Sequence, residues 1–217
     1  MFKKLFSWWH EEVLLKEALE ESAAALEKAG EMFCFAMDLL LGGIGEEQKI
    51  YDMDKEVNAL QIDIRKKILG HLTINPEQDV MASLVLITII VDIERIGDYS
   101  KNIAELRHMS AGKLANGRYV TEIKNIRQRI EVSLPVVKAA FMKADAEKAK
   151  GLLDEFVWVG HRCDRVLESL VGDESLSVRE AVVSGLLFRY LKRVGAHLRN
   201  ISSSVVNPFH RLGYKPD

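Results

Sequence analysis

The sequence predicts an all-α fold made of two similar three-helix bundles in tandem. Three observations support this prediction. Apolar residues recur with a helical period over six long segments. Strand and turn signals are scarce, with only four prolines in 217 residues. The third and sixth segments also repeat one another at a constant offset of 98 residues. The formal charge of −2 gives no indication of nucleic-acid binding.

The first repeat is expected over residues 11–109. Its first helix covers Glu11–Leu41 and ends at a glycine-rich turn. A second helix is predicted for Glu46–Leu69, followed by a turn over residues 70–75. The third helix is predicted to begin at Asn75-Pro76, with Asn as its cap and Pro in its first turn, and to end near Met109.

The third helix contains the longest apolar run of the chain, Val80–Val91. Its β-branched content would also suit a strand. The helix-start signal before it, and the absence of any breaker between it and the polar stretch Asp92–Leu106, favour a helix. The run is well short of the roughly 20 residues that a membrane-spanning helix needs.

A linker over residues 110–118 leads into the second repeat, expected over residues 119–206. Its helices are predicted at 119–143, 145–171 and 176–206, with Asp145 as a helix cap. Pro135 lies inside the first of these helices and is expected to bend or open it. Residues 207–217 are interpreted as a tail.

Two further features bear on location. Residues 1–10 are basic and aromatic, so Phe2–Trp9 either contacts a membrane or a partner, or packs on the bundle itself. The two cysteines, Cys34 and Cys163, lie in helical patterns and are expected to be buried, reduced thiols, as in a cytoplasmic protein.

Oxygen-bearing side chains form stripes on the second and third helices. At roughly 100° per residue, four positions of the third helix fall on one stripe. Such a stripe either coordinates a hard cation or lies in water with Arg95 or Lys101 as ion partner. On the second helix, the positively charged Arg65 counts against metal binding. The stripes read Glu94, Asp98, Asn102 and Glu105 on the third helix, and Asp54, Asn58, Gln61 and Arg65 on the second.

The repeat is clearest where residues 93–103 align with residues 191–201. Each copy places a glycine, Gly97 or Gly195, in the middle of a helix. Such a glycine costs about 1 kcal/mol against alanine. We expect close approach of a neighbouring helix at both positions to offset that cost.

These residues resemble the PhoU family of phosphate-uptake regulators. The sequence Glu94–Tyr99 followed by Asn102–Glu105 is similar to the family's third-helix motif, and Asp54-xxx-Asn58 to its second-helix motif, with Asn58 where Asp is usual. The resemblance implies a six-helix, non-enzymatic, cytoplasmic regulator. It implies contact with a phosphate transporter of the ATP-binding-cassette type and its sensor histidine kinase, and a metal centre of iron, zinc or another divalent or trivalent metal.

The second repeat departs from that motif. Lys192 stands in the place of Glu94, and Ala196 in the place of Asp98. A lysine in the place of a ligand carboxylate would repel a cation. We therefore expect at most one metal ion or cluster, in the first repeat. Its predicted ligands are Glu94, Asp98, Asp54, Asn58 and Asn102.

A basic face is the other candidate site, either for an anionic partner or simply solvated; it comprises Arg95, Lys192, Arg193 and Arg199. A location at the inner face of the cell membrane and a homodimer are left open. One alternative function is a ligand-free helical scaffold, or an accessory subunit of another phosphate carrier. A di-metal carboxylate oxidase is disfavoured, because Glu105-x-x-His108 has no second copy.

Overall fold

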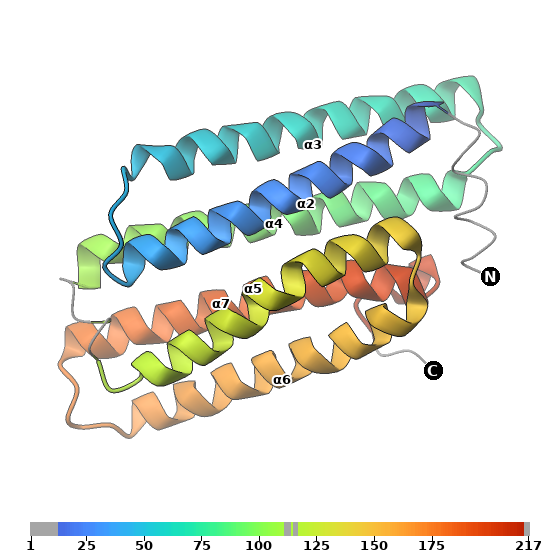
Figure 1. Ribbon diagram of the computed structural model, residues 1–217. Coiled ribbons are helices and arrows are strands. Elements are labelled where there is room, and N and C mark those ends of the chain that lie inside the picture. The colour runs from blue at the N-terminus through green and yellow to red at the C-terminus, as the bar shows by residue number, and fades with distance from the viewer. Residues whose placement is uncertain (1–12, 111–113, 115–116, 215–217) are drawn as a thin grey trace.

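The computed structural model describes residues 13–110, 114 and 117–214, so the predicted aromatic segment at 1–10 lies outside the described residues. The first repeat consists of α2 (Val13–Leu40), α3 (Gln48–Ile74) and α4 (Val80–Ser110), which contact one another. Figure 1 shows these three helices running along one long axis in one half of the molecule. The described residues contain no strand, as the sequence predicted.

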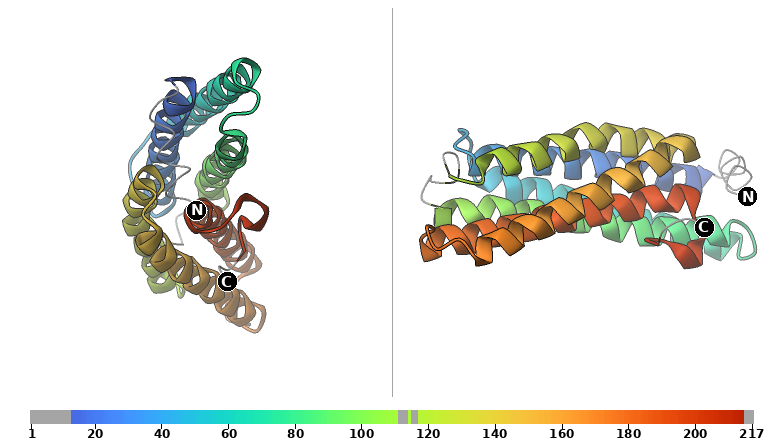
Figure 2. Two further views of the ribbon diagram at one scale, coloured as in Figure 1. Left: turned by 90° about the vertical axis from the view of Figure 1, so that its right-hand side faces the viewer. Right: turned by 90° about the horizontal axis from the view of Figure 1, so that it is seen from below.

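The second repeat consists of α5 (Val120–Lys143), α6 (Ala146–Val171) and α7 (Val178–Val206), followed by the short 3₁₀ helix η2 (Phe209–Arg211). The repeats join where α4 contacts α7 and α2 contacts α5. Figure 2 shows an elongated molecule in which the helices α2 to α7 follow the same long axis. Within the described residues, no helix has the length and apolar character needed to cross a membrane.

The boundary between α3 and α4 differs from the prediction. The turn predicted from Gly70 onward is helical, and α3 continues to Ile74. Its buried face extends through Ile64 and Ile68 to His71, and this tertiary burial outweighs the low helix propensity of Gly70. The predicted helix start at Asn75 is wrong: the Asn75 amide donates to the His71 carbonyl at 2.8 Å, closing α3 instead.

Other helix ends follow local capping chemistry. The predicted cap Asp145 is confirmed, because its carboxylate accepts from the Lys148 amide at 3.1 Å. The last helix begins at Val178, two residues later than predicted, behind a capping box formed by Ser177 and Glu180. Helix α5 continues through Pro135.

A single apolar core extends through both repeats, with Phe33, Phe141 and Phe188 fully buried. The expected close approach at the two mid-helix glycines is confirmed. A Cβ atom on Gly97 would lie 3.4 Å from the Met32 sulfur, and one on Gly195 would lie 3.0 Å from Val159 Cγ1.

Both cysteines are free thiols. Cys163 is buried as expected, whereas Cys34 is only partly buried. Burial raises the pKa of Cys34 to about 11, with the neighbouring Glu131 charge adding to the effect. Burial also raises the pKa of Cys163 to about 12. Both side chains are therefore protonated and weakly reactive at neutral pH.

The contact between α4 and α7 reflects the internal repeat. Tyr99 and His197 are equivalent at the 98-residue offset, and their rings stack with centroids 5.7 Å apart. Asp92 and Tyr190 are equivalent at the same offset. The Asp92–His197 pair, joined by a 2.7 Å contact, therefore corresponds to the Tyr190–Tyr99 ring pair. Equivalent residues thus meet one another, as across an approximate two-fold axis.

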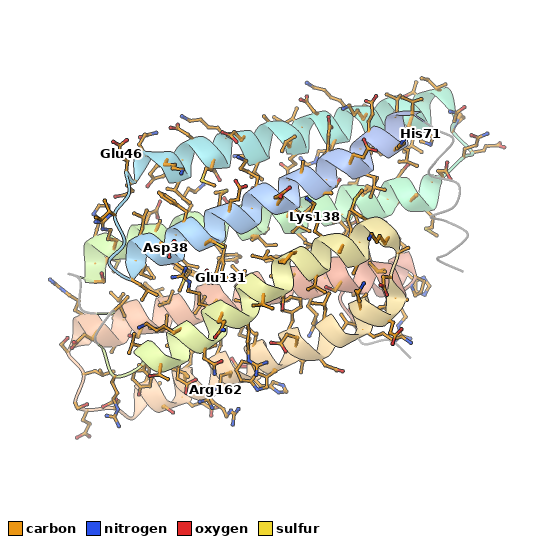
Figure 3. The ribbon with its side chains drawn as sticks, in the orientation of Figure 1. Asp38, Glu46, His71, Glu131, Lys138 and Arg162 are labelled. Carbon is orange, nitrogen blue, oxygen red and sulfur yellow. The ribbon has the colours of Figure 1, made fainter. Side chains whose placement is uncertain are left out.

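Ion pairs connect α2 to α5 along one edge of the contact between the two repeats. Arg127 donates to Asp38 at 2.6 Å and to Glu131 at 2.7 Å. Lys138 donates to Glu27 at 2.6 Å. Figure 3 shows Asp38 and Glu131 beside each other where these two helices face. These ion pairs between the repeats were not predicted from the sequence.

Candidate functional site

The structure brings three of the predicted metal ligands together between α3 and α4. Lys101 Nζ donates to Asp54 Oδ2 at 3.1 Å and to Asp98 Oδ1 at 3.3 Å. Asn58 Nδ2 donates to Asp54 Oδ2 at 3.2 Å. The Lys101 ammonium therefore lies between carboxylates from two helices, in the place where a bridging cation would lie.

Glu94 lies one turn before Asp98 in α4, on the same face of the helix. Arg95 Nη1 donates to Asp98 at 3.0 Å, and Arg95 Nε lies 3.6 Å from Glu94. Burial raises the pKa of Glu94, and the negative charge of Asp98 raises it further. The cluster thus carries more negative charge than its cations neutralise.

The negative charge of the cluster also affects the pKa of Lys101. Burial lowers the pKa of Lys101, but the hydrogen bonds and charges of Asp54 and Asp98 outweigh burial and raise the pKa overall. The lysine is therefore fully protonated at neutral pH and supplies the cation that its surroundings require.

Among the described residues, the remaining positions of the α4 stripe, Asn102 and Glu105, make no hydrogen bond to this cluster. Asn102 is partly buried on α4 and has no hydrogen bond to Asp54 or Asp98 among the described residues. Glu105 accepts from the Tyr51 hydroxyl at 3.1 Å, and His108 pairs with Glu47 at 2.8 Å. The Glu105-x-x-His108 pattern therefore makes two separate exposed contacts, one with Tyr51 on α3 and one with Glu47 just before α3.

The arrangement does not fit a metal centre as it stands. Across the described parts of the chain, no three His, Cys, Asp or Glu side chains are grouped so that they could hold a metal ion. Lys101 also separates Asp54 from Asp98. The metal site stays a prediction, and the lysine contacts weigh against it. The sequence indicated Lys101 as a partner of Asp98, but not its tie to Asp54 on α3.

The second repeat uses a lysine in a comparable way. Lys192 Nζ on α7 donates to both carboxylate oxygens of Asp164 on α6, at 2.6 and 2.7 Å. In each repeat, a lysine of the third helix therefore pairs with an aspartate of the second.

The predicted basic face is divided among different contacts. Arg95 and Lys192 are engaged with carboxylates, as described above. Arg199 donates to the Gly213 carbonyl at 2.7 Å, which holds the segment after η2 against α7. Arg193 is exposed on α7. The structure therefore leaves Arg193 as the member of this set that is most open to a partner.

Comparisons with known proteins agree with this architecture. The family model described as PhoU domain matches residues 22–106. A Pseudomonas putida protein named phosphate-specific transport system accessory protein PhoU homolog is 24% identical over 75% of this chain and 65% of its own length. A Deinococcus radiodurans protein of the same name is 24% identical over 72% of this chain and 76% of its own.

Solved structures show the same fold. The crystal structure of PhoU from Pseudomonas aeruginosa superimposes with a TM-score of 0.81 at 20% identity, covering 89% of this chain and 95% of that one. The phosphate transport system regulatory protein PhoU from Streptococcus pneumoniae gives a TM-score of 0.73 at 18% identity, covering 95% of each chain. The chain thus matches a PhoU domain at residues 22–106 and shares the PhoU fold over most of its length.

Proposed function

We propose that this protein is a non-enzymatic regulator of phosphate uptake and of phosphate-responsive gene expression. The observation that carries the proposal is the PhoU domain, together with relatives named as accessory proteins of phosphate-specific transport. The protein would act by direct contact with a phosphate transporter or its sensor histidine kinase, at the cytoplasmic side of the membrane.

The candidate site supports action through helix surfaces. Lys101 and Lys192 each join a third helix to a second helix through carboxylates, as a structural ion would. Partly buried ion pairs of this kind fix the position of one helix against another. This observation favours the variant of the proposal in which the protein is a scaffold that needs no metal.

Arg193 is the natural place to look for the contact with a partner. Its guanidinium is exposed near the middle of α7, on a rigid helix. Guanidinium groups bind carboxylates and phosphates in two-point geometry, which suits an acidic segment on a transporter or kinase. Arg193→Glu is expected to weaken such a contact without altering the core.

The test is a deletion strain carrying a phosphate-responsive reporter gene. We expect the deletion to derepress the reporter in phosphate-rich medium, and the wild-type gene to restore repression. A Glu94→Ala/Asp98→Ala variant that also restores repression would support a scaffold independent of these carboxylates. An unchanged reporter in the deletion strain would contradict the proposed function.

A further inference from the structure

A hollow of about 330 Å³ opens between α6 and α7, where the second repeat carries the counterpart of the first-repeat site. Two small residues create it. Gly160 lies one helical turn before Asp164 on α6, and Ala196 stands where the first repeat has Asp98. A Cβ atom on Gly160 would meet no other atom within 4 Å, so this side of the hollow is open.

The charge of this hollow is opposite to that of its counterpart. In the first repeat, the three carboxylates of Asp54, Glu94 and Asp98 outnumber the two cations, Lys101 and Arg95. In the second repeat, Lys192 replaces Glu94 and Arg199 replaces Lys101, and the one carboxylate in the lining is Asp164. Since Asp164 is paired with Lys192, the Arg199 guanidinium is the excess charge, and the site is net positive.

The lining also supplies suitable hydrogen-bond donors. Arg199 has five N–H groups, and the Gly213 carbonyl accepts from one of its terminal nitrogens. Lys192 has a third ammonium proton beyond the two directed at Asp164, and its side chain is 32% exposed. The exposed His161 at the rim adds a ring nitrogen.

The apolar part of the lining consists of Phe156, Val157 and Ala196. Phe156 is buried, so this surface belongs to the rigid core of the bundle. Apolar lining lowers the local dielectric and strengthens the attraction between a bound anion and the cations around it. The hollow is at the small end of the range of ligand sites, which run from about 300 to 1,000 Å³.

We propose that this hollow binds a small tetrahedral oxyanion of the class of phosphate and sulfate. Arg199 would hold two oxygens through its fork of N–H groups, and Lys192 would contribute its free proton and charge. The inference rests on the hollow and its charge, and is independent of the proposed regulatory function.

The test is isothermal titration of the full chain with inorganic phosphate, and separately with sulfate, at an ionic strength held constant with chloride. Two variants alter the site in different ways. Ala196→Asp places a carboxylate in the hollow and keeps both of its cations, Lys192 and Arg199. Arg199→Gln removes the excess cation. The matched control is Arg189→Gln, which removes an exposed arginine of α7 that does not line the hollow.

We expect the wild type to bind one oxyanion per chain, and either variant to weaken binding by at least about tenfold. The control should remain within about twofold of wild type. Circular dichroism checks that each variant is folded. If Ala196→Asp does not fold, the comparison of wild type with Arg199→Gln tests the proposal. No saturable binding of either anion, or equal binding by wild type and folded variants, would overturn the proposal.

Discussion

Lys101 holds α3 and α4 together in the first repeat through its contacts with Asp54 and Asp98. A side chain of this length can reach across a helix pair and donate hydrogen bonds to two carboxylates at once. The sequence could predict that Lys101 meets Asp98, because they are three residues apart on one helix. It could not predict the contact with Asp54, because that depends on how two helices are rotated against each other.

Replacing Lys101 by methionine should leave the clustered carboxylates without their central cation. We expect Lys101→Met to lower the free energy of unfolding by about 1–2 kcal/mol, since both partners are largely buried from solvent. Urea unfolding followed by circular dichroism measures this change. Lys66→Met removes an exposed pair with Asp63 and should have little effect. Equal effects of the two substitutions would contradict the assigned role of Lys101.

Glu94 provides a prediction about pH. Its pKa is raised above 4.5 by burial and then by Asp98, so the folded protein takes up this proton more readily than the unfolded chain. Ionised Glu94 therefore destabilises the folded state above that pH. We expect Glu94→Gln to raise the Tm by about 1–3 °C at pH 7, with the gain disappearing as the pH falls below 4.5.

The measurement is thermal unfolding of wild type and Glu94→Gln from pH 3.5 to pH 8. The control is Glu174→Gln, which alters an exposed carboxylate in the turn before α7. This variant should change the Tm only slightly, and by the same amount at every pH. A gain for Glu94→Gln that persists unchanged at the acid end would show that the effect does not arise from ionisation.

Among the helices, the long periodic segments were predictable and their junctions less so. The apolar stripes and the Asp145 cap placed α5 and α6 within one or two residues of their observed ends. The junction of α3 and α4 was misplaced because Asn75-Pro76 has the chemistry of a helix start. The burial of His71 keeps α3 helical past Gly70, and burial of this kind cannot be read from local sequence.

Helix α7 offers a matched pair of glycines that tests its packing against α6. A Cβ atom on Gly195 would lie 3.0 Å from Val159, whereas one on Gly185 would meet nothing within 4 Å. We expect Gly195→Ala to destabilise the protein by about 1–2 kcal/mol through overpacking. Gly185→Ala should stabilise it by about 0.5–1 kcal/mol through helix propensity.

Chemical denaturation of the two alanine variants measures both changes under the same conditions. Both variants replace glycine by alanine in the same helix. The difference between their free energies of unfolding therefore isolates the contact with α6. Stabilisation of both variants would contradict the close approach at Gly195.

At the scale of the whole molecule, the offset of 98 residues predicted two related halves, and equivalent residues do meet between α4 and α7. The sequence did not predict which faces would join. Asp92 is 8% exposed at this joint and accepts from His197 at 2.7 Å and from Asn200 at 2.9 Å. A polar residue at the end of an apolar run gave no local signal of this role.

Asp92→Ala should leave the donors on His197 and Asn200 without their acceptor. We expect a loss of about 2–3 kcal/mol in the free energy of unfolding, because buried polar groups would remain unpaired. Asp63→Ala, on the exposed face of α3, serves as the control and should cost far less. Adding Asn200→Ala to Asp92→Ala should cost less than Asn200→Ala alone costs in the wild type, and full additivity would contradict the coupling.

The central proposal is that this protein restrains phosphate uptake through contact with another protein. The most direct measurement is the initial rate of labelled phosphate uptake in phosphate-rich cells that lack the gene, carry the wild type or carry Arg193→Glu. We predict faster uptake in the deletion strain, restoration of the slow rate by the wild type, and weaker restoration by Arg193→Glu. Identical uptake rates with and without the gene would contradict the claim.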